Sequence, residues 1–254
     1  MKNFRNIRLY VGGKLFLGNE LILTEKQSHY LCNVMRCKKD DIIKCFNPTS
    51  GEFFCQITLL DKKKTVIKIF EKNKDPEKQE DLWLIFSPLK KDKTDFVIEK
   101  AVELGVSKII PVITHYTNSD KVKIDRFVSQ AIEAAEQCGR ISIPDIIEAI
   151  KLDDLLSSWD DSRTLFFMDE RRNGNAILPL FKKSSSKMSA ILIGPEGGFS
   201  DEEALKINEC KFVKNVSLGP RILRAETAAL ASLAIWQATV GDWHKGEIDE
   251  DINS

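Results

Sequence analysis

The stretch ILIGPEGGFSDEE (residues 191–203) indicates how the second half of the chain folds, because it joins an apolar strand to a helix. Ser200 and Glu203 have the spacing of a capping box, which predicts that the helix begins at Ser200. Glycines between a strand and a helix let the backbone approach a ligand closely. The stretch lacks the lysine of a GxxxxGK[ST] phosphate loop and carries the carboxylate of Glu196 at its centre. We therefore expect a ligand site that is not an ordinary phosphate cradle.

Strands and helices alternate around this stretch. This alternation predicts an α/β fold with a mostly parallel sheet and helices on its faces. The last helix is apolar nearly all round, and we expect it to be buried. The predicted strands are 82–89, 106–113, 164–168, 189–194 and 213–219, and the predicted helices are 93–104, 125–140, 175–182, one that begins at Ser200, and 226–242.

The first part of the chain has a different pattern, with β-branched and aromatic runs at 42–46, 53–60 and 65–70. Residues 24–36 are consistent with one helix, in which Thr24 is the N-cap and Gln27 completes a capping box. The pattern predicts a small β-barrel-like domain with one helix. The polar segment 71–81 contains Pro76, and we expect it to be a linker.

The formal net charge is zero, but the charges are unevenly distributed. Residues 1–75 hold 15 Lys and Arg against 8 Asp and Glu, while the remainder holds 23 against 30. A basic segment on an acidic body favours a surface for a polyanion, although a solvated lysine-rich surface fits the charge equally well.

Several other classes of protein are not supported. No CxxC pair occurs among the six cysteines and there are only three histidines, so we expect no metal site. The N-terminus has no apolar signal core and no apolar run reaches spanning length, so we expect a cytoplasmic protein without a membrane segment. No GxGxxG follows the first α/β strand and no GxSxG occurs, which disfavours a dinucleotide domain and a serine nucleophile.

Three loops leave the carboxyl ends of predicted strands, where open α/β sheets bind their ligands. They are MDERR (168–172), GPEGGFS (194–200) and LGPRILRAET (218–227). The third loop adds Arg221 and Arg224, and arginines are common binders of phosphate. Each loop alone could be an ordinary turn, but together they predict a ligand site.

The two late motifs carry a resemblance to a known family. IGPEGGFSDEE, followed by SLGPRILRAETAAL, resembles the paired signature of the bacterial 16S rRNA uridine-N3 methyltransferases of the SPOUT (knotted) class. KAVELGVSKIIPVIT (100–114), AIEAAEQCGRISIPDI (131–146) and HYLCNVMRCKKDD (29–41) resemble other segments of that family. Met35 stands where the family usually has leucine, which is a conservative change.

The resemblance implies a PUA-like RNA-binding barrel over residues 1–72, a SPOUT methyltransferase domain with a trefoil knot over 73–244, and an acidic tail over 245–254. It implies S-adenosylmethionine as cofactor, a homodimer, and methylation of N3 of a uridine in 16S rRNA within the small ribosomal subunit. The residues expected to bind the cofactor are Met168, Ile193, Gly194, Glu196, Gly197, Leu218, Gly219, Ile222 and Leu223. Glu196 could contact the cofactor or could only accept amides of its own turn.

We expect Arg224 to stabilise negative charge on the uridine and Arg221 to hold a phosphate. Glu226 could be only an acid that stabilises the start of its helix. The residues expected to bind RNA are Lys2, Arg5, Arg8, Arg36 and Arg140. Two alternatives stay open: an RNA-binding assembly factor that has lost catalysis, and a SPOUT-type methyltransferase that acts on tRNA or on a ribose 2′-hydroxyl.

Overall fold

The structure is a computed structural model that describes residues 3–117, 122–171, 174–183 and 188–243. The chain forms two compact units. The first contains the residues up to 78 together with 135–143, and the second contains 79–134 and the residues from 144 onward. Residues 135–143 therefore belong with the N-terminal residues although they lie far along the chain.

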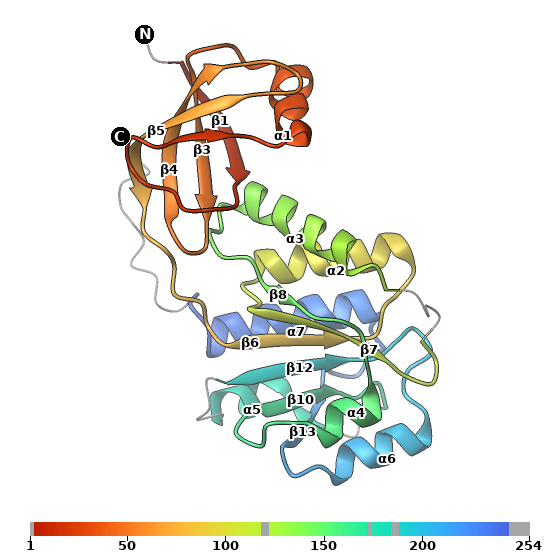
Figure 1. The fold of residues 1–254 in the computed structure, drawn as a ribbon. Coiled ribbons are helices and arrows are strands. Elements are labelled where there is room, and N and C mark those ends of the chain that lie inside the picture. The colour runs from red at the N-terminus through yellow and green to blue at the C-terminus, as the bar shows by residue number, and fades with distance from the viewer. Residues whose placement is uncertain (1–2, 118–121, 172–173, 184–187, 244–254) are drawn as a thin grey trace. The chain divides into compact units, whose positions relative to one another are not determined.

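The first unit is built on a five-stranded mixed sheet with the strand order β1-β3-β4-β5-β2 (Figure 1). β1 pairs with β3 in parallel, and the other neighbours are antiparallel. The predicted strands correspond to β3, β4 and β5, except that Leu60 and Thr65 lie just outside β4 and β5. The strands are β1 (Asn3–Tyr10), β2 (Glu20–Ile22), β3 (Asp41–Asn47), β4 (Gly51–Leu59) and β5 (Val66–Lys74).

The prediction of a linker over residues 71–81 is wrong for its first part, because β5 continues to Lys74. Pairing with β4 extends as far as Glu52 and Lys74, so ladder hydrogen bonds hold these residues in a strand in spite of their polar composition. The segment becomes irregular only after Lys74.

The helix expected over 24–36 is two helical segments instead of one. The capping box of Thr24 and Gln27 is confirmed and starts α1 (Glu25–His29). A π-helical turn follows over Tyr30–Val34, in which the Met35 amide donates to the Tyr30 carbonyl at 2.9 Å. The wider turn changes the direction in which later side chains point, and Leu31 is fully buried in the core of the unit.

The core of the first unit lies on one face of the sheet and includes Leu31, Cys45, Phe53 and Ile69. On the other face, Arg8 holds the unit together through its guanidinium. Its Nε lies 2.5 Å from the Glu52 carboxylate, and its Nη atoms donate to the carbonyls of Ala135 (2.6 Å) and Arg140 (3.2 Å). Arg8 therefore joins the strands to segment 135–143.

The second unit contains a sheet in which every pairing is parallel (Figure 1). Its strand order is β11-β13-β10-β12-β6-β7-β8, and β9 pairs with β7. The five predicted strands are confirmed as β6 (Leu82–Phe86), β7 (Lys108–Ile113), β10 (Thr164–Met168), β12 (Ser189–Ile193) and β13 (Val213–Ser217). The short strands β8 (Asp145–Ile146), β9 (Ile150–Lys151) and β11 (Asn175–Ala176) were not predicted from the sequence.

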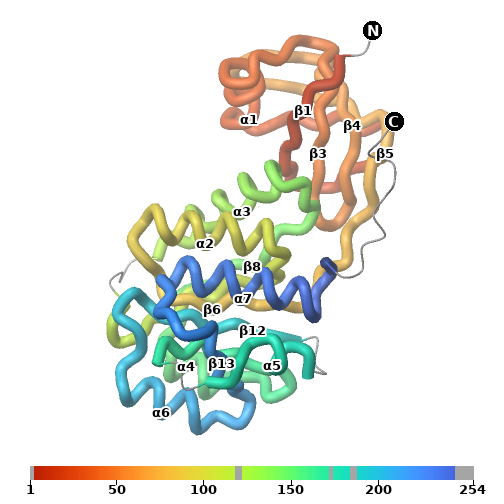
Figure 2. The backbone as a smooth tube through the Cα atoms, turned by 180° about the vertical axis from the view of Figure 1, so that it is seen from behind, coloured from red at the N-terminus to blue at the C-terminus, as the bar shows by residue number. Residues whose placement is uncertain are grey.

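Helices cover both faces of this sheet, as predicted. α2, α5 and α7 lie on one face, and α4 and α6 lie on the other (Figures 1 and 2). Only α4 has no counterpart among the predicted helices. The helices are α2 (Lys91–Glu103), α3 (Ile124–Cys138), α4 (Leu152–Ser157), α5 (Ile177–Lys183), α6 (Asp201–Glu209) and α7 (Ala225–Thr239).

The prediction that the last helix is buried holds for one side of α7 only. Leu233 and Trp236 are fully buried, whereas Leu230 and Ile235 are only half-buried. α7 thus keeps a partly exposed apolar side after covering the sheet.

We predict that Arg8→Met lowers the free energy of unfolding by about 3 kcal/mol, because it leaves the Glu52 carboxylate buried without its charge partner. The side chains of Arg8 and Glu52 are only 10% and 2% exposed. Urea unfolding of the intact protein measures the loss. Lys14→Met, at an exposed lysine of the same unit, is the matched control. The double variant Arg8→Met/Glu52→Gln should recover most of the loss, and an Arg8→Met protein as stable as the control would contradict the role of this pair.

Candidate functional site

The three loops singled out in the sequence follow β10, β12 and β13, which are neighbours in the parallel sheet. Phe167 pairs with Leu192 and Met168 pairs with Val216, so the three strands end at nearly the same level. The loops therefore leave the sheet side by side at its carboxyl edge, where ligands of such sheets bind.

A cavity of about 530 Å³ opens between these loops and the start of α7. A smaller cavity of about 40 Å³ lies beside it and shares Met168, Glu170, Ile222, Leu223 and Ala228 with it. The larger volume is of the size that holds a small cofactor. The structure brings together all nine residues expected to bind the cofactor, since each lines one or both cavities: Met168, Ile193, Gly194, Glu196, Gly197, Leu218, Gly219, Ile222 and Leu223.

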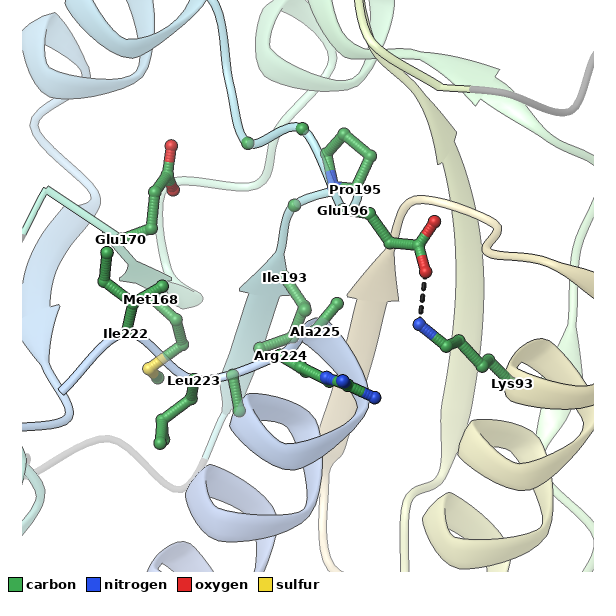
Figure 3. Close-up of a pocket in the computed structure, with 14 residues that line it drawn as sticks. Lys93, Met168, Glu170, Ile193, Pro195, Glu196, Ile222, Leu223, Arg224 and Ala225 are labelled. Atoms are coloured by element: carbon green, nitrogen blue, oxygen red, sulfur yellow. Dashed lines mark hydrogen bonds and ion pairs between the residues drawn. The ribbon is translucent and has the colours of Figure 1, made fainter.

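One side of the large cavity is apolar. Met168, Ile222 and Leu223 lie together there, opposite Glu196 and Lys93 (Figure 3). Ile222 is 76% exposed and extends this apolar wall to the protein surface. Such a wall suits a flat apolar ligand surface such as an adenine ring.

Packing explains the glycines of the loop that follows β12. A Cβ atom at Gly194 would lie 2.6 Å from the Phe199 ring, and one at Gly197 would lie 3.2 Å from the Tyr116 Cβ. Gly198 has a φ of +72° and lies against the Glu170 carboxylate, which accepts the Phe199 amide hydrogen at 3.1 Å. The loop is thus held tightly from outside while its backbone lines the cavity.

Among the described residues, the Glu196 carboxylate accepts no hydrogen bond from the backbone amides of its own turn. Its carboxylate pairs with Lys93, from the first turn of α2 (Figure 3). The hydrogen bond from Lys93 lowers the pKa of Glu196, and the same contact raises the pKa of Lys93. Both groups are therefore charged near neutral pH, and the cavity keeps a fixed ion pair on this side.

Lys93 also lies near a second carboxylate. Its Nζ is 3.6 Å from Glu226 Oε1, in the first turn of α7. The other oxygen of Glu226 is buried and has no hydrogen-bond partner among the described residues. Lys93 thus joins the start of α2 to the glycine loop and to the start of α7.

Sequence reasoning missed Lys93 and Glu170. β6 lies next to β12 in the sheet, so the segment after β6 also leaves from the carboxyl edge. Applying the strand-end argument to that segment would have included Lys93. Glu170 lies within a loop that was singled out, but its contact with the next loop has no local sequence signal.

The two arginines of the third loop reach different cavities. Arg224 is the N-cap residue of α7 and lines the large cavity, and Arg221 lines the small one. Both are exposed. Each cavity is therefore lined by one exposed arginine, to which an anionic group could bind.

The residues expected to bind RNA have different environments in the first unit. Arg36 is exposed, and Arg5 donates to the Met35 carbonyl at 2.7 Å. Arg140 is half-buried and donates to Ser142 Oγ at 2.7 Å. Lys2 lies outside the described residues. The expectation that Arg8 binds RNA is corrected. Its guanidinium is buried against Glu52 and backbone carbonyls, so the structure does not present it at a surface.

Two further findings concern the described residues only. They contain no group of three or more His, Cys, Asp and Glu side chains that could hold a metal ion. Within the same ranges, no helix combines the length and the apolarity needed to cross a membrane.

The chain matches two family models: an RNA methyltransferase domain over residues 76–237 and an RNA methyltransferase PUA domain over residues 23–70. It is 35% identical to the ribosomal RNA small subunit methyltransferase E of Rickettsia conorii, over 89% of this chain and 93% of that protein. It is 30% identical to the protein of the same name from Bacillus subtilis, over 84% and 87% of the two chains.

Solved structures agree with these matches. A ribosomal RNA small subunit methyltransferase E from Neisseria gonorrhoeae, bound to S-adenosyl methionine, has a TM-score of 0.81 and 27% identity over 91% of this chain and 97% of that chain. A putative methyltransferase from Legionella pneumophila with bound SAM has a TM-score of 0.82 and 28% identity over 92% and 98%. The fold, the matched domains and the relatives together show that this chain is an RNA methyltransferase of the ribosomal RNA small subunit methyltransferase E family.

Proposed function

We propose that this protein transfers a methyl group from S-adenosylmethionine to N3 of a uridine in the 16S rRNA of the small ribosomal subunit. The observation that carries the proposal is the large cavity at the carboxyl edge, where the apolar wall, the glycine backbone and Arg224 meet. The printed names of the relatives support the RNA, and the SAM in two similar solved structures supports the cofactor.

The residues of the cavity fit this cofactor. Met168, Ile222 and Leu223 would pack against the adenine, and the glycine loop would offer backbone groups to the ribose and adenine edges. Glu170 adds negative charge near a ligand that carries a sulfonium and an ammonium group, whereas the charge of Glu196 is balanced by Lys93. When bound, S-adenosylmethionine supplies the methyl group.

The chain's own residues must favour the uridine anion, because N3 carries a proton before methylation. A guanidinium placed near O2 or O4 would stabilise the negative charge that forms as the N3 proton leaves. Arg224 is suited to this because it is exposed and lines the large cavity. The free amides at the start of α7 add positive potential at the same place.

Arg221 would hold an RNA phosphate beside the target. It is exposed and lines the small cavity next to the large one, so it can bind an anion without occupying the methyl-transfer position. N3 lies on the Watson–Crick edge of uridine. The target base must therefore be unpaired or turned out of a helix before it can enter the cavity.

The remaining assignments form part of the same proposal. Residues 1–72 would be a PUA-like RNA-binding barrel and 73–244 a SPOUT domain with a trefoil knot. The two matched family models, over 23–70 and 76–237, support a PUA domain followed by an RNA methyltransferase domain. The protein would be a cytoplasmic homodimer. The half-buried apolar residues of α7, such as Leu230 and Ile235, support the homodimer because a second copy could cover them.

The direct test is methyl transfer by the purified protein to unmethylated small ribosomal subunits and to free 16S rRNA, in separate reactions. Mass spectrometry of nuclease digests should find one new methyluridine with the methyl group on N3. A methyl group on a ribose or on another base would contradict the proposed chemistry, and no transfer to either substrate would contradict the proposed activity.

We predict that Arg224→Ala lowers kcat at least about a hundredfold, the usual effect of removing one group that stabilises developing charge. The affinity for S-adenosylmethionine should stay within about threefold, because other residues form the adenine wall. Single-turnover methyl transfer and calorimetric titration measure the two quantities. Arg221→Ala is the matched control and should raise KM for the RNA while leaving kcat nearly unchanged. A near-normal kcat in Arg224→Ala would contradict the catalytic role proposed for Arg224.

We also predict that Gly198→Ala weakens cofactor binding about tenfold. The positive φ of Gly198 would cost an alanine roughly 1–2 kcal/mol, and the new Cβ would displace the Glu170 carboxylate from the Phe199 amide. Gly12→Ala, where the new Cβ would meet nothing within 4 Å, is the control for a harmless glycine substitution. Equal cofactor affinity in Gly198→Ala and wild type would show that the loop conformation does not set the affinity.

A further inference from the structure

Three phenylalanine rings form a continuous row across the sheet of the first unit. Phe4 on β1 meets Phe54 on β4 edge to face, with ring centroids 5.6 Å apart. Phe54 is stacked with Phe70 on β5, with centroids 6.5 Å apart and planes 25° apart. The neighbours of Phe54 in the chain, Phe53 and Cys55, point into the core. The row therefore lies on the face of the sheet opposite to the core.

This row is accessible to a ligand. Phe4 is 57% exposed, and Phe54 and Phe70 are half-buried. Single exposed apolar residues are common on proteins, but a connected row of aromatic rings on a sheet usually marks a binding surface. The carboxyl end of β1 does not belong to this surface, because Arg8 contacts segment 135–143 there.

Lysines lie on the same face as the rings. Lys44 is the register partner of Phe54, and its Nζ lies 5.8 Å from the centre of that ring. Lys68 is exposed and is the register partner of Gln56, two residues from Phe54 on the same side of β4. Glu71 is the exposed acidic residue opposite Phe54, and the charge of Glu52 is compensated by Arg8. Lysines beside stacked rings are complementary to a chain of phosphates and bases.

We infer that this aromatic row binds unpaired nucleotides of the RNA substrate. Bases would stack on Phe4 and on the accessible part of Phe54, and Lys44 and Lys68 would contact the phosphates between them. The inference rests on the proposed function in that RNA is the substrate. It adds a binding site for single-stranded RNA on the first unit, formed by residues other than the arginines considered from the sequence.

The test uses the intact protein and a labelled, unstructured oligouridine, with binding measured by fluorescence anisotropy at several salt concentrations. Phe4→Ala should raise Kd about tenfold, the effect of losing one stacking ring, and should leave the slope of log Kd against log salt unchanged. Lys44→Gln should reduce that slope by about one, because a phosphate contact is lost. Binding of a perfect RNA duplex should not respond to Phe4→Ala.

Matched variants separate stacking from other causes. Phe16→Ala removes a phenylalanine of the same unit that is 56% exposed but is not part of the row, and it should bind as wild type. Phe4→Trp should keep the affinity, whereas Phe4→Leu should lose it although it stays apolar. Equal losses in Phe4→Ala and Phe16→Ala, or full affinity in Phe4→Leu, would overturn the stacking site.

Methyl transfer distinguishes failure of this inference from failure of the proposed function. Phe4→Ala should raise KM for the RNA substrate without changing kcat or cofactor affinity. If wild type methylates the uridine and Phe4→Ala binds oligouridine normally, the inference is wrong and the function stands. If wild type transfers no methyl group but Phe4→Ala still loses RNA affinity, the function is wrong and the site stands. If Phe4→Ala bound assembled ribosomal subunits more weakly but bound oligouridine normally, Phe4 would contact a ribosomal protein, and the inference would also be overturned.

Discussion

Parallel pairing of β12, β10 and β13 is the constraint on which the functional site depends. Because the three strands run in one direction in adjacent positions, segments from residues 169, 194 and 218 onward leave the sheet together. None of these segments could form the cavity alone: one contributes Glu170, the second the glycine backbone and the third the apolar and arginine side chains. The sheet therefore assembles a site from three segments that together span about fifty residues of the chain.

An ion pair between two different elements of the fold lies on one side of this cavity. Lys93 on α2 pairs with Glu196 and approaches Glu226 on α7, so the starts of two helices are tied to the glycine loop. The lysine that would follow the glycines in a phosphate loop is absent, and a lysine from another helix instead neutralises a carboxylate. This arrangement suits a ligand whose own charges are a sulfonium, an ammonium and a carboxylate rather than a chain of phosphates.

Much of the fold could be predicted because its signals are local. The capping boxes at Thr24 and Ser200 mark helix starts within four residues of sequence, and the strand periodicity marks the sheet. What could not be predicted depends on partners far along the chain. Arg8 carries the same charge as any RNA-binding arginine, but Glu52 and segment 135–143 make it a buried structural residue. Lys93 and the continuation of β5 to Lys74 likewise depend on Glu196 and β4, which no local pattern shows.

Calorimetric titration of the intact protein with S-adenosylmethionine tests the central claim most directly. The claim is that the loops after β10, β12 and β13 form the cofactor pocket. Wild type should bind the cofactor saturably. Leu223→Asp should lose binding because it places a charge in the apolar wall of the cavity. Leu178→Asp, at an exposed leucine outside the cavity, should bind the cofactor normally. Absence of binding by wild type, or equal binding by Leu223→Asp, would contradict the account.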